Sequence, residues 1–158
     1  MKVARSLTPG EVALARTIFA DAIDYGRVAI VHRRWWWFQP RNVVMAPTGN
    51  IHFHPASELY REDFSEALLS LQGLFIHEMT HVWQTQRHGR YYLPLMRHPF
   101  CRYGYQITAG RRFDRYGLEQ QAELVRHHFL LAQGMRVAVQ GDLPPLPFGP
   151  PVTQVQQA

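Results

Sequence analysis

The stretch Leu74-Phe75-Ile76-His77-Glu78-Met79-Thr80-His81-Val82-Trp83-Gln84 decides the fold, because it contains the pattern H-E-x-x-H. Residues four apart lie one above the other on a helix, so His77 and His81 place two imidazoles on one helix face. Two such imidazoles can bind a single Zn²⁺ at about 2.0–2.1 Å each. Glu78 follows the first histidine, so it can reach the open side of the metal and act as general base toward a water that the metal activates.

The pattern fixes only three residues, and it also occurs by chance in core helices that contain two packed histidines. Its flanks favour a metal site, because the helix is apolar around the histidines, as a buried helix that carries ligands inward must be. A carboxylate in such a helix costs free energy unless it has a partner or a function. We therefore predict one Zn²⁺ per chain. The apolar flanking residues are Leu71, Leu74, Phe75, Met79 and Val82.

A catalytic zinc takes three protein ligands and a water, so a third ligand must come from elsewhere in the chain. A histidine six residues after His81 is excluded, because Arg87 stands there. His98 is one candidate. Glu119 is the favoured one, because the pattern E-x-x-A-E over 119–123 falls on a predicted helix at the margin of its apolar stripe. Glu123 shares a face with Glu119 and could accept a hydrogen bond from the far nitrogen of a ligand histidine.

These two motifs together resemble the glutamate-zincin, or thermolysin-like, metallopeptidases. The resemblance implies that His77, His81 and Glu119 bind zinc and that Glu78 is the catalytic base. The chain has Glu123 where that family usually has aspartate. The family also supplies a second donor to the oxyanion, for which the candidates here are Tyr103, Tyr105, His98 and His127. A centre with His98 as third ligand would instead resemble that of the SprT-like proteases, which act on DNA-crosslinked proteins.

Most of residues 7–133 also resembles small bacterial Vgr-related proteins. The likeness covers the opening Leu7-Thr8-Pro9-Gly10-Glu11-Val12-Ala13-Leu14-Ala15-Arg16, the tryptophan run and the H-E-x-x-H segment. It implies a zincin-like domain that is linked to type VI secretion.

The expected fold class is α+β, a small zincin-like domain at 1–135 with a proline-rich tail at 136–158. Capping signals and apolar spacing predict helices at 7–23, 62–70, about 71–87 and 116–133. A β-branched run predicts a strand at 27–33, and a turn at 47–50 predicts a hairpin over 42–54. The resemblance to zincins implies that peptide substrate would lie along this hairpin. Strand alternation would put His52 and His54 together on a polar face, with a second metal site as a less favoured alternative.

The composition narrows the possible partners. A single cysteine in 158 residues excludes an intrachain disulfide, and no run of about 18 apolar residues exists that could span a membrane. No signal peptide is visible, which predicts synthesis in the cytoplasm with export by a specialised secretion system as an option. The net charge of +5 would suit an anionic partner such as nucleic acid. The arginines are spread along the chain, so nucleic acid is not the expected partner.

Four consecutive aromatic residues, Trp35 to Phe38, follow Arg33 and Arg34. They cannot all point inward from one strand. They could form a platform for peptide, glycan or a membrane interface, stack on nucleic-acid bases, or cover the core as a lid, which is the favoured interpretation.

The predicted function is therefore a zinc-dependent metallopeptidase that hydrolyses peptide bonds in a peptide or protein substrate. One alternative is a catalytically silent zincin-fold module that binds or builds part of a bacterial secretion system. Another is a nucleic-acid-associated SprT-like protease that uses His98. A purely structural zinc site would not need the base Glu78, which favours the enzyme.

Overall fold

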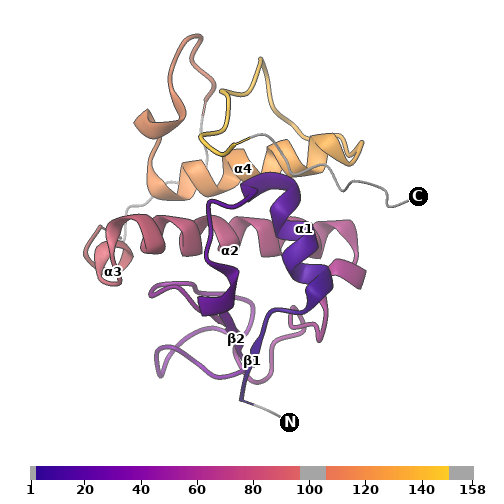
Figure 1. The fold of residues 1–158 in the computed structure, drawn as a ribbon, viewed down its shortest axis with the longest axis vertical. Helices are drawn as coiled ribbons and strands as arrows, with labels where there is room; N and C mark the ends of the chain where they lie inside the picture. Colours follow the sequence, from indigo (N-terminus) through magenta and orange to yellow (C-terminus); the bar gives the residue numbers. More distant parts are fainter. Residues whose placement is uncertain (1–2, 97–105, 150–158) are drawn as a thin grey trace.

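The computed structural model describes residues 3–96 and 106–149, which form an α+β fold around two long antiparallel helices (Figure 1). The helices are α1 (Pro9–Phe19), α2 (Leu69–His88), α3 (Tyr92–Met96) and α4 (Leu118–Ala132). The strands are β1 (Ala4–Ser6), β2 (Ala29–Val31) and β3 (Ile51–His52). Three short 3₁₀ helices are η1 (Tyr25–Arg27), η2 (Phe64–Glu66) and η3 (Phe113–Arg115). The predicted α+β class is confirmed, with four α-helices and three strands in these described ranges.

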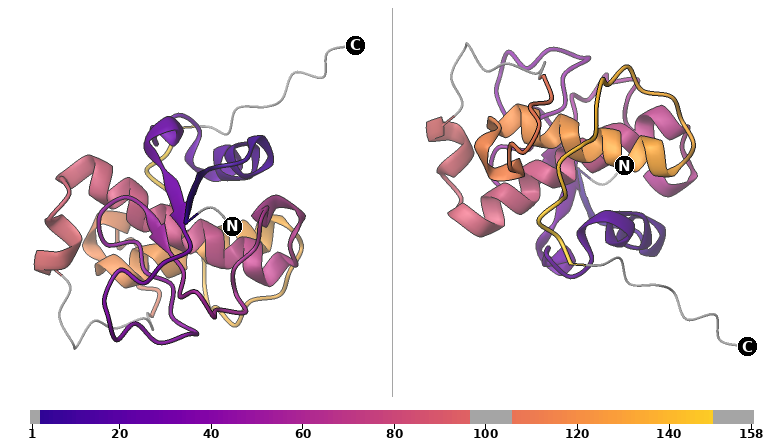
Figure 2. Two further views of the ribbon diagram at one scale, coloured as in Figure 1. Left: turned by 90° about the horizontal axis from the view of Figure 1, so that it is seen from below. Right: turned by 90° about the horizontal axis from the view of Figure 1, so that it is seen from above.

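Helices α2 and α4 lie side by side (Figures 1 and 2). Strand β3 contacts α2, and α1 contacts η2, which itself contacts α2. Helix α2 is buried from Phe75 to Thr85, which is the whole stretch that carries the motif. Gly73 allows α4 to approach closely near the start of α2, because a methyl group at this position would lie 3.1 Å from Cδ2 of Leu130. None of the helices in the described residues has the length and apolar character needed to cross a membrane.

The sheet is small and mixed. β1 pairs antiparallel with β2, whereas β2 pairs parallel with β3. The predicted hairpin over 42–54 is wrong in extent, since its two arms share only the bridge between Met45 and His52. His52 and His54 are both buried, and so are their neighbours Ile51 and Phe53. Such a short ladder depends on packing around it rather than on strand pairing.

Other predicted boundaries also differ from the observed ones. Helix α1 has the predicted Thr8 cap and Glu11 capping box but ends at Phe19 rather than at 23. The helix expected at 62–70 is wrong, because only η2 forms there before α2 begins at Leu69. The strand expected at 27–33 shortens to β2. β1 and α3 were not predicted, since three or five residues leave too little pattern to detect.

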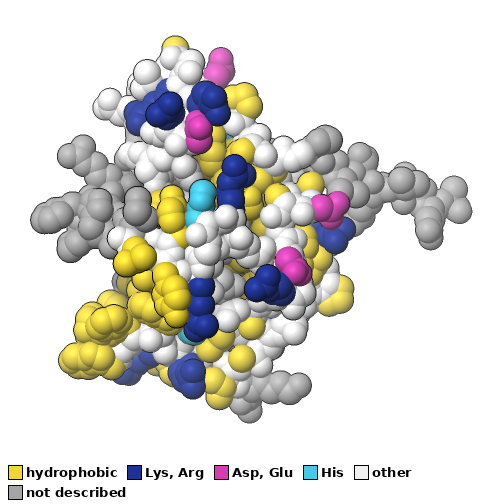
Figure 3. Space-filling view, turned by 60° about the vertical axis from the view of Figure 1, so that its left-hand side comes forward, with side chains coloured by type: hydrophobic (Ala, Val, Ile, Leu, Met, Phe, Trp, Pro, Cys, Tyr) yellow, Lys and Arg dark blue, Asp and Glu magenta, His cyan; other side chains and the backbone are white. Residues whose placement is uncertain are grey.

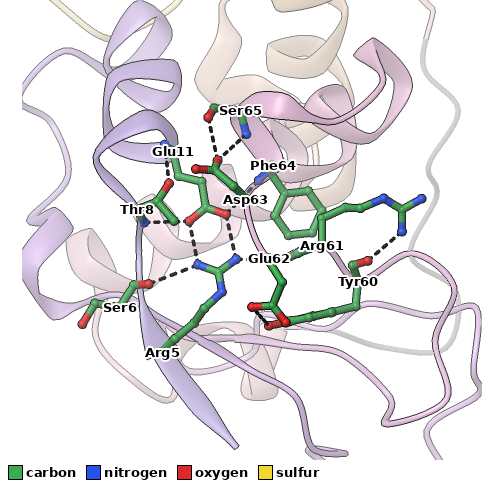
Figure 4. A network of polar contacts seen from close by, with 10 residues as sticks. All are labelled: Arg5, Ser6, Thr8, Glu11, Tyr60, Arg61, Glu62, Asp63, Phe64 and Ser65. Atoms are coloured by element: carbon green, nitrogen blue, oxygen red, sulfur yellow. Dashed lines mark hydrogen bonds and ion pairs between the residues drawn. The ribbon is translucent and has the colours of Figure 1, made fainter. Parts of the chain in front are cut away.

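A buried ion pair joins β1, α1 and the loop before α2 (Figure 4). The two guanidinium nitrogens of Arg5 lie 2.8 Å from the two carboxylate oxygens of Glu11, whose side chain is fully buried. Glu11 also accepts hydrogen bonds from the backbone N–H groups of Thr8 and Phe64. This network ties β1 and α1, which are neighbours in sequence, to Phe64, which is 53 residues after Glu11, and it thereby positions the start of α2.

The core continues into the proline-rich segment after α4. Phe148 makes edge contacts with Phe19 of α1 at 4.8 Å between ring centroids and with Trp83 of α2 at 5.1 Å. Three further apolar side chains of this segment, Val137, Leu143 and Leu146, also pack against the core. Residues 137–148 therefore pack on the same core as the helices, although the composition alone suggested a tail from 136 onward.

Candidate metal centre

Three of the predicted ligands meet between α2 and α4. His77 and His81 project from α2, and Glu119 projects from the first turn of α4. Their ligand atoms all lie within 4.8 Å of one another, and all three side chains are buried. Oε2 of Glu119 lies 3.4 Å from Nε2 of His77 and 3.2 Å from Nε2 of His81. The described residues contain no other group of three such side chains with this spacing, and no such group there includes His52 or His54.

The antiparallel packing of α2 and α4 explains why the three side chains converge. Contacts between the helices pair His77 with Glu123 and His81 with Glu119, so residue numbers rise on α2 as they fall on α4. Positions four apart lie on one face of each helix, so both imidazoles and both carboxylates point into the same seam. Glu119 is acidic in the first turn of α4, where the positive end of the helix dipole favours a carboxylate.

The outer nitrogens of both imidazoles have acceptors. Nδ1 of His77 lies 2.7 Å from Oε1 of Glu123. Nδ1 of His81 lies 2.8 Å from Oε1 of Gln84. His81, whose Nδ1 is hydrogen-bonded to Gln84, can present a lone pair at Nε2, which is the form that binds a metal. His77 is held at Nδ1 by the ion pair with Glu123, and it would give up its proton on binding a metal. Two Nε2 atoms and a buried carboxylate oxygen are the donor set of a catalytic zinc site, so these residues fit a single Zn²⁺.

Gln84 is the site residue that the sequence analysis did not single out. Its amide nitrogen donates to the backbone oxygen of Leu118 and to the side-chain oxygen of Gln121. These two contacts with α4 direct its oxygen toward His81. The signal in the sequence was its position three residues after His81, which places both side chains on one face of the helix.

The electrostatics of the centre are dominated by carboxylates. Burial disfavours the protonated form of His77, but Glu119, Glu123 and the charge of Glu78 outweigh it and raise the pKa of His77 to about 9. Burial also favours the neutral form of Glu123, yet His77, Arg126 and His127 lower its pKa. The seam therefore concentrates negative charge, and a divalent cation would neutralise it.

The predicted catalytic base and oxyanion donors are placed as follows. Glu78 is buried on α2, next in the chain to His77. His127 lies one turn after Glu123 on α4, with its Nε2 3.7 Å from Oε2 of that carboxylate. Burial lowers the pKa of His127, and the positive charges of Arg126 and His128 lower it further, against the effect of Glu123. The other candidates, Tyr103, Tyr105 and His98, lie outside the described residues.

Comparison with known proteins shows which proteins the chain is related to. No family model matches it. It is 40% identical over 134 residues to the type VI secretion system spike protein VgrG2b of Pseudomonas aeruginosa. That alignment covers 80% of this chain but only 13% of the spike protein. Among solved structures, the effector domain of Pseudomonas aeruginosa VgrG2b superposes with a TM-score of 0.72 at 37% identity.

The structural match covers 82% of this chain and 75% of the solved domain. At this identity and coverage the two share ancestry as well as fold. The resemblance to Vgr-related proteins is therefore confirmed, and the chain belongs to the family of the VgrG2b effector domain.

Proposed function

We propose that this domain is a zinc-dependent metallopeptidase that serves as an effector of a type VI secretion system. The observation that carries the proposal is the meeting of His77, His81 and Glu119 in a buried seam. Nδ1 of His81 is hydrogen-bonded to Gln84, and Nδ1 of His77 is in ion-pair contact with Glu123. The kinship with a spike protein's effector domain supports the link to secretion.

The chain's own residues would divide the work as follows. Zinc, when bound, lowers the pKa of a water to about 7 and polarises the carbonyl that is attacked. Glu78 takes the proton from the attacking water and passes it to the leaving amine. Glu123 and Gln84 keep His77 and His81 oriented for metal binding. His127 is the one candidate for a donor to the oxyanion among the described residues, and burial lowers its pKa.

The position of Glu119 favours the glutamate ligand over His98. Its carboxylate lies within 3.4 Å of Nε2 of both histidines. A glutamate from a second helix at this place supports the glutamate-zincin type of centre rather than the SprT-like one. The peptide substrate is proposed from the chemistry of that class of centre.

A second candidate is a catalytically silent module that a secretion spike carries for binding. The relatives support this candidate better than the enzyme, because their names specify a spike and an effector and no reaction. The two candidates differ in what they require of Glu78. A peptidase needs its carboxylate as base, whereas a silent module needs only that the fold persists.

The deciding experiment compares the wild-type protein with Glu78→Gln, Glu119→Ala and the control Glu66→Gln. Glu66 is exposed and lies outside the seam. We would measure zinc by elemental analysis and hydrolysis with a mixed library of quenched fluorescent peptides. We expect about one zinc per chain in all variants except Glu119→Ala. We expect a loss of hydrolysis in Glu78→Gln of at least about a hundredfold.

Two results would overturn the proposal. A wild-type protein that takes up no zinc after incubation with the metal would remove the metal centre altogether. Zinc uptake without hydrolysis of any peptide, and with Glu78→Gln indistinguishable from wild type, would leave the silent module as the function.

A further inference from the structure

The aromatic run between β2 and β3 is exposed rather than folded over the core. The exposed fractions are 46% for Trp36, 77% for Trp37 and 60% for Phe38, and the nearby Val43 is 38% exposed. The predicted lid over the core is therefore wrong for these side chains. Figure 3 shows hydrophobic side chains gathered at one edge of the molecule, with arginine or lysine side chains beside them. Large apolar side chains that cluster on a surface mark a contact site.

The loop that carries these rings is held in place by hydrogen bonds of a buried side chain. Gln39 is buried, and its side-chain oxygen accepts a hydrogen bond from the backbone N–H of Trp35. Its amide nitrogen donates to the backbone oxygens of Val43 and His52, which ties the loop to β3. Arg34 adds a hydrogen bond to the backbone oxygen of Trp37. The rings are thus displayed by a preorganised loop, so little conformational entropy is lost when they bind.

The charge around the loop has one sign. From residue 25 to residue 57 the chain contains four arginines and no aspartate or glutamate. This segment therefore carries four of the five net positive charges, which leaves thirteen basic and twelve acidic residues in the rest of the chain. The arginines are spread along the whole sequence, but the acidic residues avoid this part of it. Three of the arginines, Arg33, Arg34 and Arg41, are exposed and lie within a few residues of the aromatic run in sequence.

We propose that Trp36, Trp37, Phe38 and Val43, with the flanking arginines, form a surface that binds the interface of an anionic lipid bilayer. Tryptophan prefers the headgroup level of a bilayer, where its ring is half in hydrocarbon and half in water. Exposed arginines are attracted to anionic headgroups at the same depth. Since no described helix can span a membrane, this contact is peripheral. Neither the metal centre nor the kinship with VgrG2b assigns this surface.

The packing of the rings favours a bilayer over nucleic acid. Trp37 and Phe38 meet edge to face at 84°, and Trp36 and Phe38 are tilted by 58°, with ring centroids 4.9 and 5.2 Å apart. Rings that cover one another in this way offer few free parallel faces for stacked bases. Val43 has no ring at all, but it adds aliphatic surface that hydrocarbon would bury.

The test is co-sedimentation with vesicles of phosphatidylcholine, alone or mixed with phosphatidylglycerol. One variant combines Trp36→Ser, Trp37→Ser and Phe38→Ser. A second combines Arg33→Gln and Arg41→Gln, and it keeps Arg34 because that side chain supports the loop. The matched control combines Leu68→Ser and Leu131→Ser, which remove exposed apolar side chains elsewhere. All changes are at exposed positions, so thermal melting should match wild type and show that each variant is folded.

We expect wild type and the leucine control to sediment with the anionic vesicles, and the aromatic variant to remain in solution. Each arginine strengthens attraction to an anionic surface about fivefold, so the arginine variant should bind these vesicles about 30-fold more weakly. The Glu78→Gln protein should bind like wild type, because the surface does not depend on the metal centre. Absence of wild-type binding to anionic vesicles would overturn the proposal. So would binding that the aromatic variant retains, or binding to a single-stranded oligonucleotide in place of the vesicles.

Discussion

The side chain of Gln84 is held between two helices, with its oxygen on Nδ1 of His81 and its nitrogen on Leu118 and Gln121. We expect Gln84→Leu to weaken zinc binding about 10- to 100-fold, because the imidazole loses the acceptor that fixes its tautomer and orientation. Gln84→Glu should retain tight binding, since a carboxylate accepts the same hydrogen bond. Competition with a chromophoric chelator measures both affinities.

Gln86→Leu is the matched control for Gln84. Gln86 lies on the same helix but bonds to Asp24, away from the metal seam. Equal zinc affinity in Gln84→Leu and in the control would show that Gln84 has no part in orienting the ligand.

The residues of the centre differ in how far the sequence could predict them. His77, Glu78 and His81 follow from one local pattern, because helical spacing alone brings the two imidazoles together. Glu119 is 38 positions after His81, so only its own helical pattern and the resemblance to a family pointed to it. Gln84 was missed because its role depends on Leu118 and Gln121. A contact between two helices leaves no periodic pattern in the sequence of either helix.

At the scale of elements, the ion pair between Arg5 and Glu11 joins β1 to α1. Replacing Arg5 with methionine would leave the buried carboxylate of Glu11 without its cation. We expect Arg5→Met to lower the free energy of unfolding by about 3–5 kcal/mol, and the double variant Arg5→Met/Glu11→Gln to recover part of that loss. Urea denaturation measures both.

Arg112→Met serves as the control for that comparison, because the ion pair of Arg112 with Asp114 is exposed at both ends. We expect a change of less than about 0.5 kcal/mol for it. An equally small effect of Arg5→Met would mean that the buried pair does not hold the three segments together.

Asp63, at the start of η2 in the same network, gives stability a pH dependence. Burial disfavours its charge, but hydrogen bonds with Ser65 and Thr8 and the charge of Arg5 lower its pKa below the usual 3.8. A lowered pKa in the folded state means that the carboxylate stabilises the fold above pH 3.8, and that this contribution disappears as the pH falls through the folded value.

Asp63→Ala should therefore reduce the urea midpoint at pH 6, and the gap to wild type should narrow once the pH falls well below 3.8. Denaturation curves at the two pH values, with Glu62→Ala as an exposed neighbour, test this expectation. A gap that stays constant with pH would assign the effect to lost packing instead of lost charge.

For the whole molecule, the segment after α4 completes the core. Phe148 contacts rings from α1 and α2, although it is only partly buried. We expect Phe148→Ala to cost about 2 kcal/mol, less than a fully buried phenylalanine, and to lower the melting temperature by about 4–8 °C. Met135→Ala, at an exposed position at the start of the segment, should change it by less than about 2 °C.

A melting temperature unchanged by Phe148→Ala would show that residues 137–148 add nothing to the stability of the domain. The composition could not indicate the observed packing. Many prolines and glycines suggest a tail, and composition does not show what the few apolar residues between them contact. The helices α1, α2 and α4 were predictable because each has a long apolar stripe. The sheet was not, because its strands are two or three residues long and are paired by packing from helices distant in sequence.

Gly73 lets α2 and α4 approach closely at a point away from the metal ligands. It lies eight residues before His81, which is about 12 Å along the helix axis. An added methyl group there would press on Leu130, so either that side chain shifts or the far ends of the two helices tilt apart. In the second case the distance between Glu119 and the imidazoles would change, and with it the radius of the ion that fits between them. Preference among divalent ions would then be adjustable from a residue that touches none of the ligands.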